Sequence, residues 1–204
     1  PLIIRWSGHI QANSISDALV SHVDVVPTLL EIANGKAVDS IDGRSFYPVL
    51  KGTKHTHREI VYASHSGDKM NNRSAIRMLR TTEYKYILNL TSADDQGRSN
   101  PNNVNVKQIP DDWLAAAYQD DKAAATMWRL THQPDEELYA VQQDPHELRN
   151  LVYSEDHQEI LQWFREQMKS IRIQQGDTGD RWKTDLNQIP QTVDGTKSIA
   201  PYSF

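Results

Sequence analysis

The 204-residue sequence contains no cysteine, which excludes disulfides, thiolate metal sites and a cysteine nucleophile within this stretch. It also lacks any apolar run close to the roughly 18 residues that a membrane-spanning helix needs, so we expect no membrane partner. The missing cysteines leave the redox compartment open.

The sequence also lacks a large excess of either positive or negative charge. The chain has 22 Lys and Arg against 27 Asp and Glu, for a formal net charge of -5, and the two signs are interspersed. Such a surface offers no broad cationic face to neutralise nucleic-acid phosphates. We therefore expect no nucleic-acid partner.

Hydrophobic residues make up 38% of the chain, enough for one domain or a large piece of a bigger one. Residues 2–6 are mostly large and apolar and predict a buried strand. Because the chain opens inside that pattern, we expect it to be a fragment of a longer protein. A helix capped by Asp24 and ended by Asn34 and Gly35 is predicted next. Its predicted apolar stripe is Val26, Leu29, Leu30 and Ala33.

From residue 58 onward the pattern changes to that of strands. Residues 59–63, 74–79 and 84–90 are rich in β-branched and aromatic side chains and predict antiparallel neighbours, with a further short strand at 137–141. The polar residues 91–110 predict a long surface loop. After them, residues 111–130 predict an Ala-rich helical stretch with a break near Asp120.

Two helix starts are predicted in the last third of the chain. Asp144, Pro145 and Glu147 have the spacing of a capped helix start. A longer helix is predicted after Ser154, ending at Gly176, and the tail from residue 177 is polar. The predicted apolar face of this helix is Ile160, Leu161, Phe164, Met168 and Ile171.

Three segments of the chain carry a family resemblance. The first is the residue 1–8 strand with the helix-forming residues 21–30, and the second is Asp42-Gly43-Arg44-Ser45-Phe46 with residues 75–77 and 84–87. The third, and the most specific, comprises Glu137-Leu138-Tyr139, Asp144-Pro145-His146-Glu147 and Asn150-Leu151. In this order and spacing they resemble the C-terminal third of the sulfatases, in the alkaline phosphatase-like superfamily, over about residues 1–170.

Two positions depart from the family pattern, which usually has Pro at Ser7 and Asp at Ala140. Within the family, the stretch from Arg58 to His65, the polar loop and Trp128 are most similar to N-sulfoglucosamine sulfohydrolases and heparan-type exosulfatases.

The resemblance implies an α+β fold in which the end of a large α/β sulfatase domain precedes a small antiparallel sheet of about four strands, packed against a long C-terminal helix. The implied boundaries are 1–57 for the end of the large domain, 58–176 for the sheet and helix, and 177–204 for an irregular tail. The implied localisation is periplasmic, secreted or lysosomal.

The implied activity of the whole protein is hydrolysis of a sulfate ester or sulfamate on a sugar, such as one derived from a glycosaminoglycan like heparan sulfate. The family's formylglycine nucleophile and its calcium ligands would precede Pro1. We therefore expect no catalytic and no metal-binding residue in this chain, and no activity from it alone. The implied partners are a sulfated sugar and the rest of the parent chain. A few local Arg or Lys suffice for such a substrate, so the acidic balance does not exclude it.

Several residue groups have a structural interpretation. His55 and His57 have the alternate spacing of some metal sites, but no carboxylate completes the set, so we expect a solvated loop. Ser21, His22 and Asp24 are the residue types of a hydrolytic triad, but no nucleophile elbow surrounds Ser21. Trp113, Trp128, Trp163 and Trp182 are predicted to face a core, and Arg77 and Lys85 to extend or pair on the sheet surface.

His65 is the main candidate for a substrate contact, because it follows a predicted strand, where loops on a rigid scaffold often carry function. In the heparan-type sulfatases that the chain resembles, this strand end faces the pocket. Arg73 is a second candidate.

Two other functions remain open from the sequence. Phosphodiesterases and phosphonate hydrolases of the same superfamily share parts of this pattern, so the reaction could differ on the same fold. The chain could also belong to a non-catalytic, sugar-binding pseudo-sulfatase.

Overall fold

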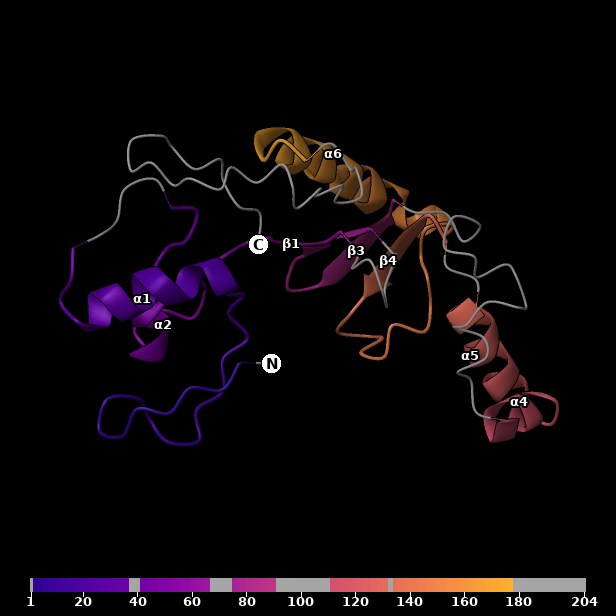
Figure 1. Ribbon diagram of the computed structural model, residues 1–204, viewed down its shortest axis with the longest axis horizontal. Helices are drawn as coiled ribbons and strands as arrows, with labels where there is room; N and C mark the ends of the chain where they lie inside the picture. Colours follow the sequence, from indigo (N-terminus) through magenta and orange to yellow (C-terminus); the bar gives the residue numbers. More distant parts are fainter. Residues whose placement is uncertain (1, 37–40, 67–74, 91–110, 132–133, 178–204) are drawn as a thin grey trace, which may run out of the picture. The chain divides into compact units, whose positions relative to one another are not determined.

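The computed structural model describes residues 2–36, 41–66, 75–90, 111–131 and 134–177 (Figure 1). The chain divides into two compact units. The first comprises Pro1–Tyr62, Leu79–Lys85 and Tyr139–Arg149, and the second comprises Ala63–Met78, Tyr86–Leu138 and Asn150–Phe204. Within the described ranges, none of the helices is long and apolar enough to cross a bilayer.

The helical part of the first unit begins with the 3-10 turn His22–Asp24, continues as α1 (Val25–Ile32), and includes the short α2 (Tyr47–Leu50). As predicted, α1 ends just before Asn34 and Gly35: Asn34 has a φ of 53° and the Gly35 N–H donates to the Leu30 carbonyl at 2.8 Å. This left-handed step turns the chain out of the helix.

The fully buried residue of α1 is the polar Thr28, and the predicted apolar stripe is wrong for three of its four residues, since only Leu30 is half-buried. Val26 and Leu29 are each 58% exposed, whereas Thr28 is buried. The Thr28 hydroxyl donates to the Asp24 carbonyl at 2.6 Å and accepts the N–H of the buried Phe46 at 3.0 Å. The helix thus packs on backbone groups of the 42–46 segment, which need hydrogen-bond partners rather than apolar cover.

A close backbone approach explains the glycine in that segment. A Cβ atom at Gly43 would lie 1.8 Å from the Val23 carbonyl oxygen, far inside any van der Waals contact. Only glycine lets the 42–46 segment run this close to the start of the helix.

The prediction of a buried strand at residues 2–6 is also wrong. The segment has no strand assignment, and Leu2, Ile3 and Ile4 are 53%, 92% and 40% exposed. A strand is held by pairing its backbone groups with a neighbour. In the described part of this unit, the isolated bridge outside the named strands joins Leu19 to Arg58 and does not involve residues 2–6.

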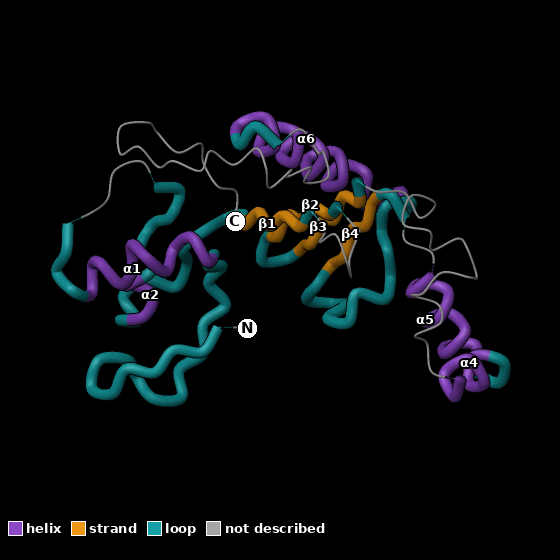
Figure 2. Tube along the Cα trace, viewed as in Figure 1, coloured by secondary structure: helices purple, strands orange, loops and turns teal. Residues whose placement is uncertain are grey.

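Four strands form one antiparallel sheet, as predicted, in the order β1 (Val61–His65), β2 (Ile76–Arg80), β3 (Tyr84–Asn89) and β4 (Glu136–Ala140) (Figure 2). The backbone bonds give the register. The Thr81 N–H donates to the Tyr84 carbonyl at 2.9 Å and the Leu90 N–H to the Ala75 carbonyl at 2.8 Å, so β2 and β3 form a hairpin. The segment 91–110, predicted to be a long surface loop, lies outside the described residues.

The long C-terminal helix of the second unit is confirmed. A 3-10 turn at Glu155–His157 leads into α6 (Gln158–Gln174), which lies over β3 and β4 (Figure 1). Its buried side chains are Leu161, Phe164 and Met168, all from the predicted apolar face. The Phe164 ring stacks on that of Tyr86 with centroids 5.8 Å apart, which joins the helix to the sheet.

The predicted helix start at Asp144 is a turn instead. Glu147 has a φ of 55°, a conformation that does not continue a right-handed helix. The Asp144 carboxylate accepts the Arg149 N–H at 2.8 Å, and the Glu147 side chain pairs with Lys85 at 2.6 Å. These contacts stabilise the turn and place Lys85 on the sheet surface in an ion pair, as predicted.

The Ala-rich stretch forms α4 (Asp111–Ala117) and α5 (Asp121–Thr131), with the predicted break at Asp120. The expectation that tryptophans face a core is wrong for three of them: Trp113, Trp128 and Trp163 are 54%, 60% and 39% exposed. Helical spacing shows which residues share a face but not whether a partner covers it. Trp182 lies outside the described residues.

Candidate functional site

His65, the main candidate from the sequence, is the last residue of β1 and has an exposed side chain. Its carbonyl oxygen accepts a hydrogen bond of 2.9 Å from Nη1 of Arg77 on the neighbouring strand. The His65 imidazole is thus accessible, while the His65 backbone is fixed by the hydrogen bond from Arg77. Arg73, the second candidate, lies outside the described residues.

Arg77 is buried, which corrects its predicted place on the sheet surface. Its side chain is 3% exposed and forms a two-point ion pair with Asp177: Nε lies 2.5 Å from Oδ2 and Nη2 lies 2.8 Å from Oδ1. The planar guanidinium fork matches a carboxylate in this way. Asp177 is 100 residues further along the chain, so no local pattern could have revealed the pair.

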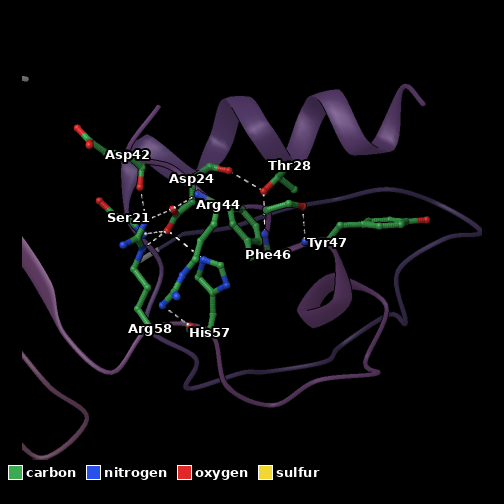
Figure 3. Close-up of polar contacts among 10 residues, drawn as sticks. Ser21, Asp24, Thr28, Asp42, Arg44, Phe46, Tyr47, His57 and Arg58 are labelled. Carbon is green, nitrogen blue, oxygen red and sulfur yellow. Dashed lines mark hydrogen bonds and ion pairs between the residues drawn. The ribbon is translucent and has the colours of Figure 1, made fainter. Parts of the chain in front are cut away.

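Asp24 is the centre of a polar cluster in the first unit (Figure 3). Its side chain is fully buried and accepts the N–H groups of Ser21 at 2.9 Å and Arg44 at 3.0 Å. Arg58 contacts both carboxylate oxygens, with Nε 2.7 Å from Oδ2 and Nη2 on Oδ1. As predicted, Asp24 occupies the N-cap position of α1, but its side chain makes no capping hydrogen bond to that helix. Its carboxylate binds the Ser21 N–H one turn upstream and joins two distant segments.

His57 and Arg58 belong to this cluster, so the expectation of a solvated loop holds only for His55, which is exposed. The His57 side chain is 7% exposed, its Nε2 lies 3.1 Å from Asp24 Oδ2, and its ring meets the edge of Phe46. The histidine that contacts Asp24 therefore comes from a segment 33 residues away, and not from the adjacent, exposed His22 that the triad-like spacing would suggest (Figure 3).

The electrostatics of Asp24 make it an anchor and not a reactive group. Burial alone would raise the pKa of its carboxyl, but the hydrogen bonds from Arg58 and from the backbone of Arg44 and Ser21 outweigh burial and lower the pKa to about 2. At neutral pH the carboxylate is ionised and fully engaged. It therefore cannot serve as a general base, for which a pKa near the working pH is needed.

A hollow of about 400 Å³ lies beside α6 in the second unit. Its carboxylates are already paired. Glu136 accepts the Tyr86 hydroxyl at 2.5 Å and pairs with Arg165, which lowers the pKa of Glu136 in spite of its burial. Burial, followed by the Glu136 contact, raises the pKa of Tyr86. At neutral pH Glu136 is therefore ionised and Tyr86 is protonated, so neither group is suited to act as a general acid or base.

Among the described residues, no group of three or more His, Cys, Asp or Glu is arranged to hold a metal ion.

Several known proteins resemble this chain in sequence. Residues 1–98 match the family model for the C-terminal part of N-sulphoglucosamine sulphohydrolase. An ulvan-active sulfatase of Formosa agariphila is 33% identical over 181 residues, which cover 87% of this chain and 33% of that protein. The N-acetylglucosamine-6-sulfatase of Capra hircus is 38% identical over 73 residues, covering 35% of this chain and 13% of that protein.

The fold agrees with these matches. The solved structure of BT4656, in complex with its substrate D-glucosamine-2-N,6-O-disulfate, superposes with a TM-score of 0.59 at 20% identity over 89% of this chain and 29% of that chain. The chain belongs to the sulfatase family. Within that family it corresponds to the C-terminal region, of the kind found in N-sulphoglucosamine sulphohydrolase. It spans about one third of the length of the ulvan-active sulfatases that it matches.

Proposed function

We propose that the protein carrying this chain hydrolyses a sulfate ester or sulfamate on a sugar from a sulfated polysaccharide. The similarity to an ulvan-active sulfatase across 87% of the chain is the observation that carries this proposal. In this proposal, the family's formylglycine and calcium would be supplied by residues outside this chain. The chain contributes architecture and one border of the substrate pocket.

His65 is the proposed substrate contact on that border. An exposed imidazole at a strand end can donate a hydrogen bond to a sugar hydroxyl or to an anionic sulfate oxygen. The bond to the sulfate oxygen is charge-assisted and therefore the stronger of the two. Arg73, a cation close by in the sequence, is proposed as a second contact with the anionic group.

A pair of substrates tests the role of His65. In the full-length protein, His65→Ala should lower kcat/KM for the sulfated sugar about tenfold, equivalent to about 1.4 kcal/mol of lost interaction. A small aryl sulfate, which would not reach this subsite, should be affected much less. His55→Ala is the matched control, because His55 is also an exposed histidine. Equal losses on both substrates, or no loss on the sugar, would show that His65 does not contact the substrate.

A further inference from the structure

We infer that Arg77 and Asp177 form a positioning pair that fixes the end of β1 and so holds His65 in place for its substrate. The inference rests on the proposed function, in which His65 contacts the sugar. Neither residue of the pair would touch the substrate. Their effect would reach it through the backbone of His65.

The three nitrogens of Arg77 connect three parts of the second unit. Nη1 donates to the carbonyl of His65 at 2.9 Å and to that of Ile76 at 3.0 Å. Nε and Nη2 bind the two oxygens of Asp177. Because the guanidinium is rigid and planar, the two bonds to Asp177 set the direction of the third nitrogen. Asp177 thereby determines where the His65 carbonyl is held.

Asp177 is itself fixed by the end of α6. Gly176, with a φ of 65°, turns the chain out of the helix, and the Asp177 N–H then donates to the Arg172 carbonyl at 2.8 Å. The Arg172 side chain adds a contact of 3.3 Å to Asp177 Oδ2. The pair therefore ties the end of the helix to the end of the strand that carries His65.

Stability alone does not explain the choice of residues. A buried ion pair contributes little net stability compared with apolar side chains of the same volume, because both charges lose their hydration. The pair instead fixes the orientation of the Arg77 guanidinium, since each hydrogen bond constrains an angle as well as a distance. Contacts that constrain orientation are useful where a side chain must be positioned against a ligand to within a fraction of an ångström.

A double-mutant cycle in the full-length protein tests the inference. The variants are Asp177→Asn, which keeps the volume but removes the charge, His65→Ala, and the two combined, each assayed on the sulfated sugar and on an aryl sulfate. We expect Asp177→Asn to lower kcat/KM for the sugar about fivefold with little change for the aryl sulfate. In the His65→Ala background the same change should have no further effect on the sugar, because the residue that it positions is gone.

The Arg165–Glu136 pair provides a matched control. It joins the same helix to β4 through a similar two-point contact, on a different strand from the one that ends at His65. Glu136→Gln should therefore leave the ratio of the two substrate activities unchanged. Asp177→Glu, which keeps the charge but displaces the carboxylate, should give an intermediate loss on the sugar only, and it replaces Asp177→Asn if that variant does not fold.

The possible outcomes distinguish failure of the positioning role of Arg77 and Asp177 from failure of the proposed sulfatase function. No effect of His65→Ala on the sugar would remove the proposed contact, and the positioning role with it, while sulfate release by the unaltered protein would still stand. An effect of His65→Ala combined with parallel losses on both substrates in the Asp177 variants would overturn the positioning role alone. Additive losses in the double variant would overturn it equally, since the two residues would then act independently.

Discussion

Asp24 and Arg58 lie 34 residues apart in the sequence and form a two-point ion pair in which the Asp24 side chain is fully buried and the Arg58 side chain is 18% exposed. The pair joins the start of α1 to the segment that leads into β1. His57 adds a third contact to the same carboxylate. The segment before the sheet is thus fastened to the helix by charge and hydrogen bonds.

Removing this carboxylate should be costly. Asp24→Ala leaves Arg58 without its carboxylate partner in a largely buried place, so we expect a loss of about 3 kcal/mol or more in the free energy of unfolding. Asp42→Ala is the control, because its exposed side chain is replaced while its backbone carbonyl, which accepts from Arg58, is kept. Urea unfolding measures both variants. Similar stabilities for the two would contradict the central role of Asp24.

The low pKa of Asp24 predicts a specific loss of stability in acid. Because the folded-state pKa is about 2 and the ordinary value is 3.8, the ionised carboxylate stabilises the fold fully above about pH 4. That contribution, about 2 kcal/mol, is lost as the pH falls toward 2. Unfolding measured at pH 5, 3 and 2 should show a smaller decrease for Asp24→Asn than for the unaltered protein. Equal decreases would mean that other groups carry the acid sensitivity.

Phe164 should be essential for stability but not for substrate choice. Its ring is fully buried against Tyr86, so Phe164→Ala should cost about 3–5 kcal/mol. Tyr153→Ala, which replaces an aromatic ring that is 88% exposed, should change stability by about 0.5 kcal/mol or less. Thermal unfolding compares them. A fully stable Phe164→Ala protein with altered substrate preference would show that α6 has a different role.

The edge of β4 depends on one asparagine side chain. Asn150 Oδ1 accepts the Leu138 N–H at 3.0 Å, and its Nδ2 donates to the Glu136 carbonyl at 3.0 Å, so the amide pairs with the strand as a neighbouring backbone would. Asn150→Asp keeps the acceptor but loses the donor, and should cost about 1–3 kcal/mol. Gln174→Ala, at an exposed position of α6, is the control. A negligible cost at Asn150, measured by urea unfolding, would show that the strand edge is held by its other contacts.

The sequence predicted those parts of the fold that depend on local periodicity. Segments rich in β-branched and aromatic residues predicted β1, β2 and β3, and the predicted apolar face of α6 includes its buried residues Leu161, Phe164 and Met168. It failed where the partner of a residue is distant. Arg77 was expected at the surface because nothing near it in the sequence indicates a buried acid, and Asp177 lies 100 residues away.

Local rules also misled where tertiary contacts override them. Asp144, Pro145 and Glu147 have the spacing of a capped helix start, yet the left-handed conformation of Glu147 ends any helix there. Residues 2–6 have the composition of a buried strand, but composition does not supply the neighbouring backbone that a strand needs. His65 was proposed from its predicted place after a strand, and the structure makes it the last residue of β1. The Arg77 side chain that binds its carbonyl could be identified only from the structure.

Hydrolysis of a sulfated sugar is the activity on which the proposed function depends. The most direct measurement is the release of inorganic sulfate by the full-length protein from sulfated saccharides, compared with product release from a phosphonate monoester and a phosphodiester under the same conditions. We predict sulfate release with a kcat/KM well above that for either phosphorus substrate. Preference for a phosphorus substrate, or saccharide binding without any sulfate release, would contradict the proposed function.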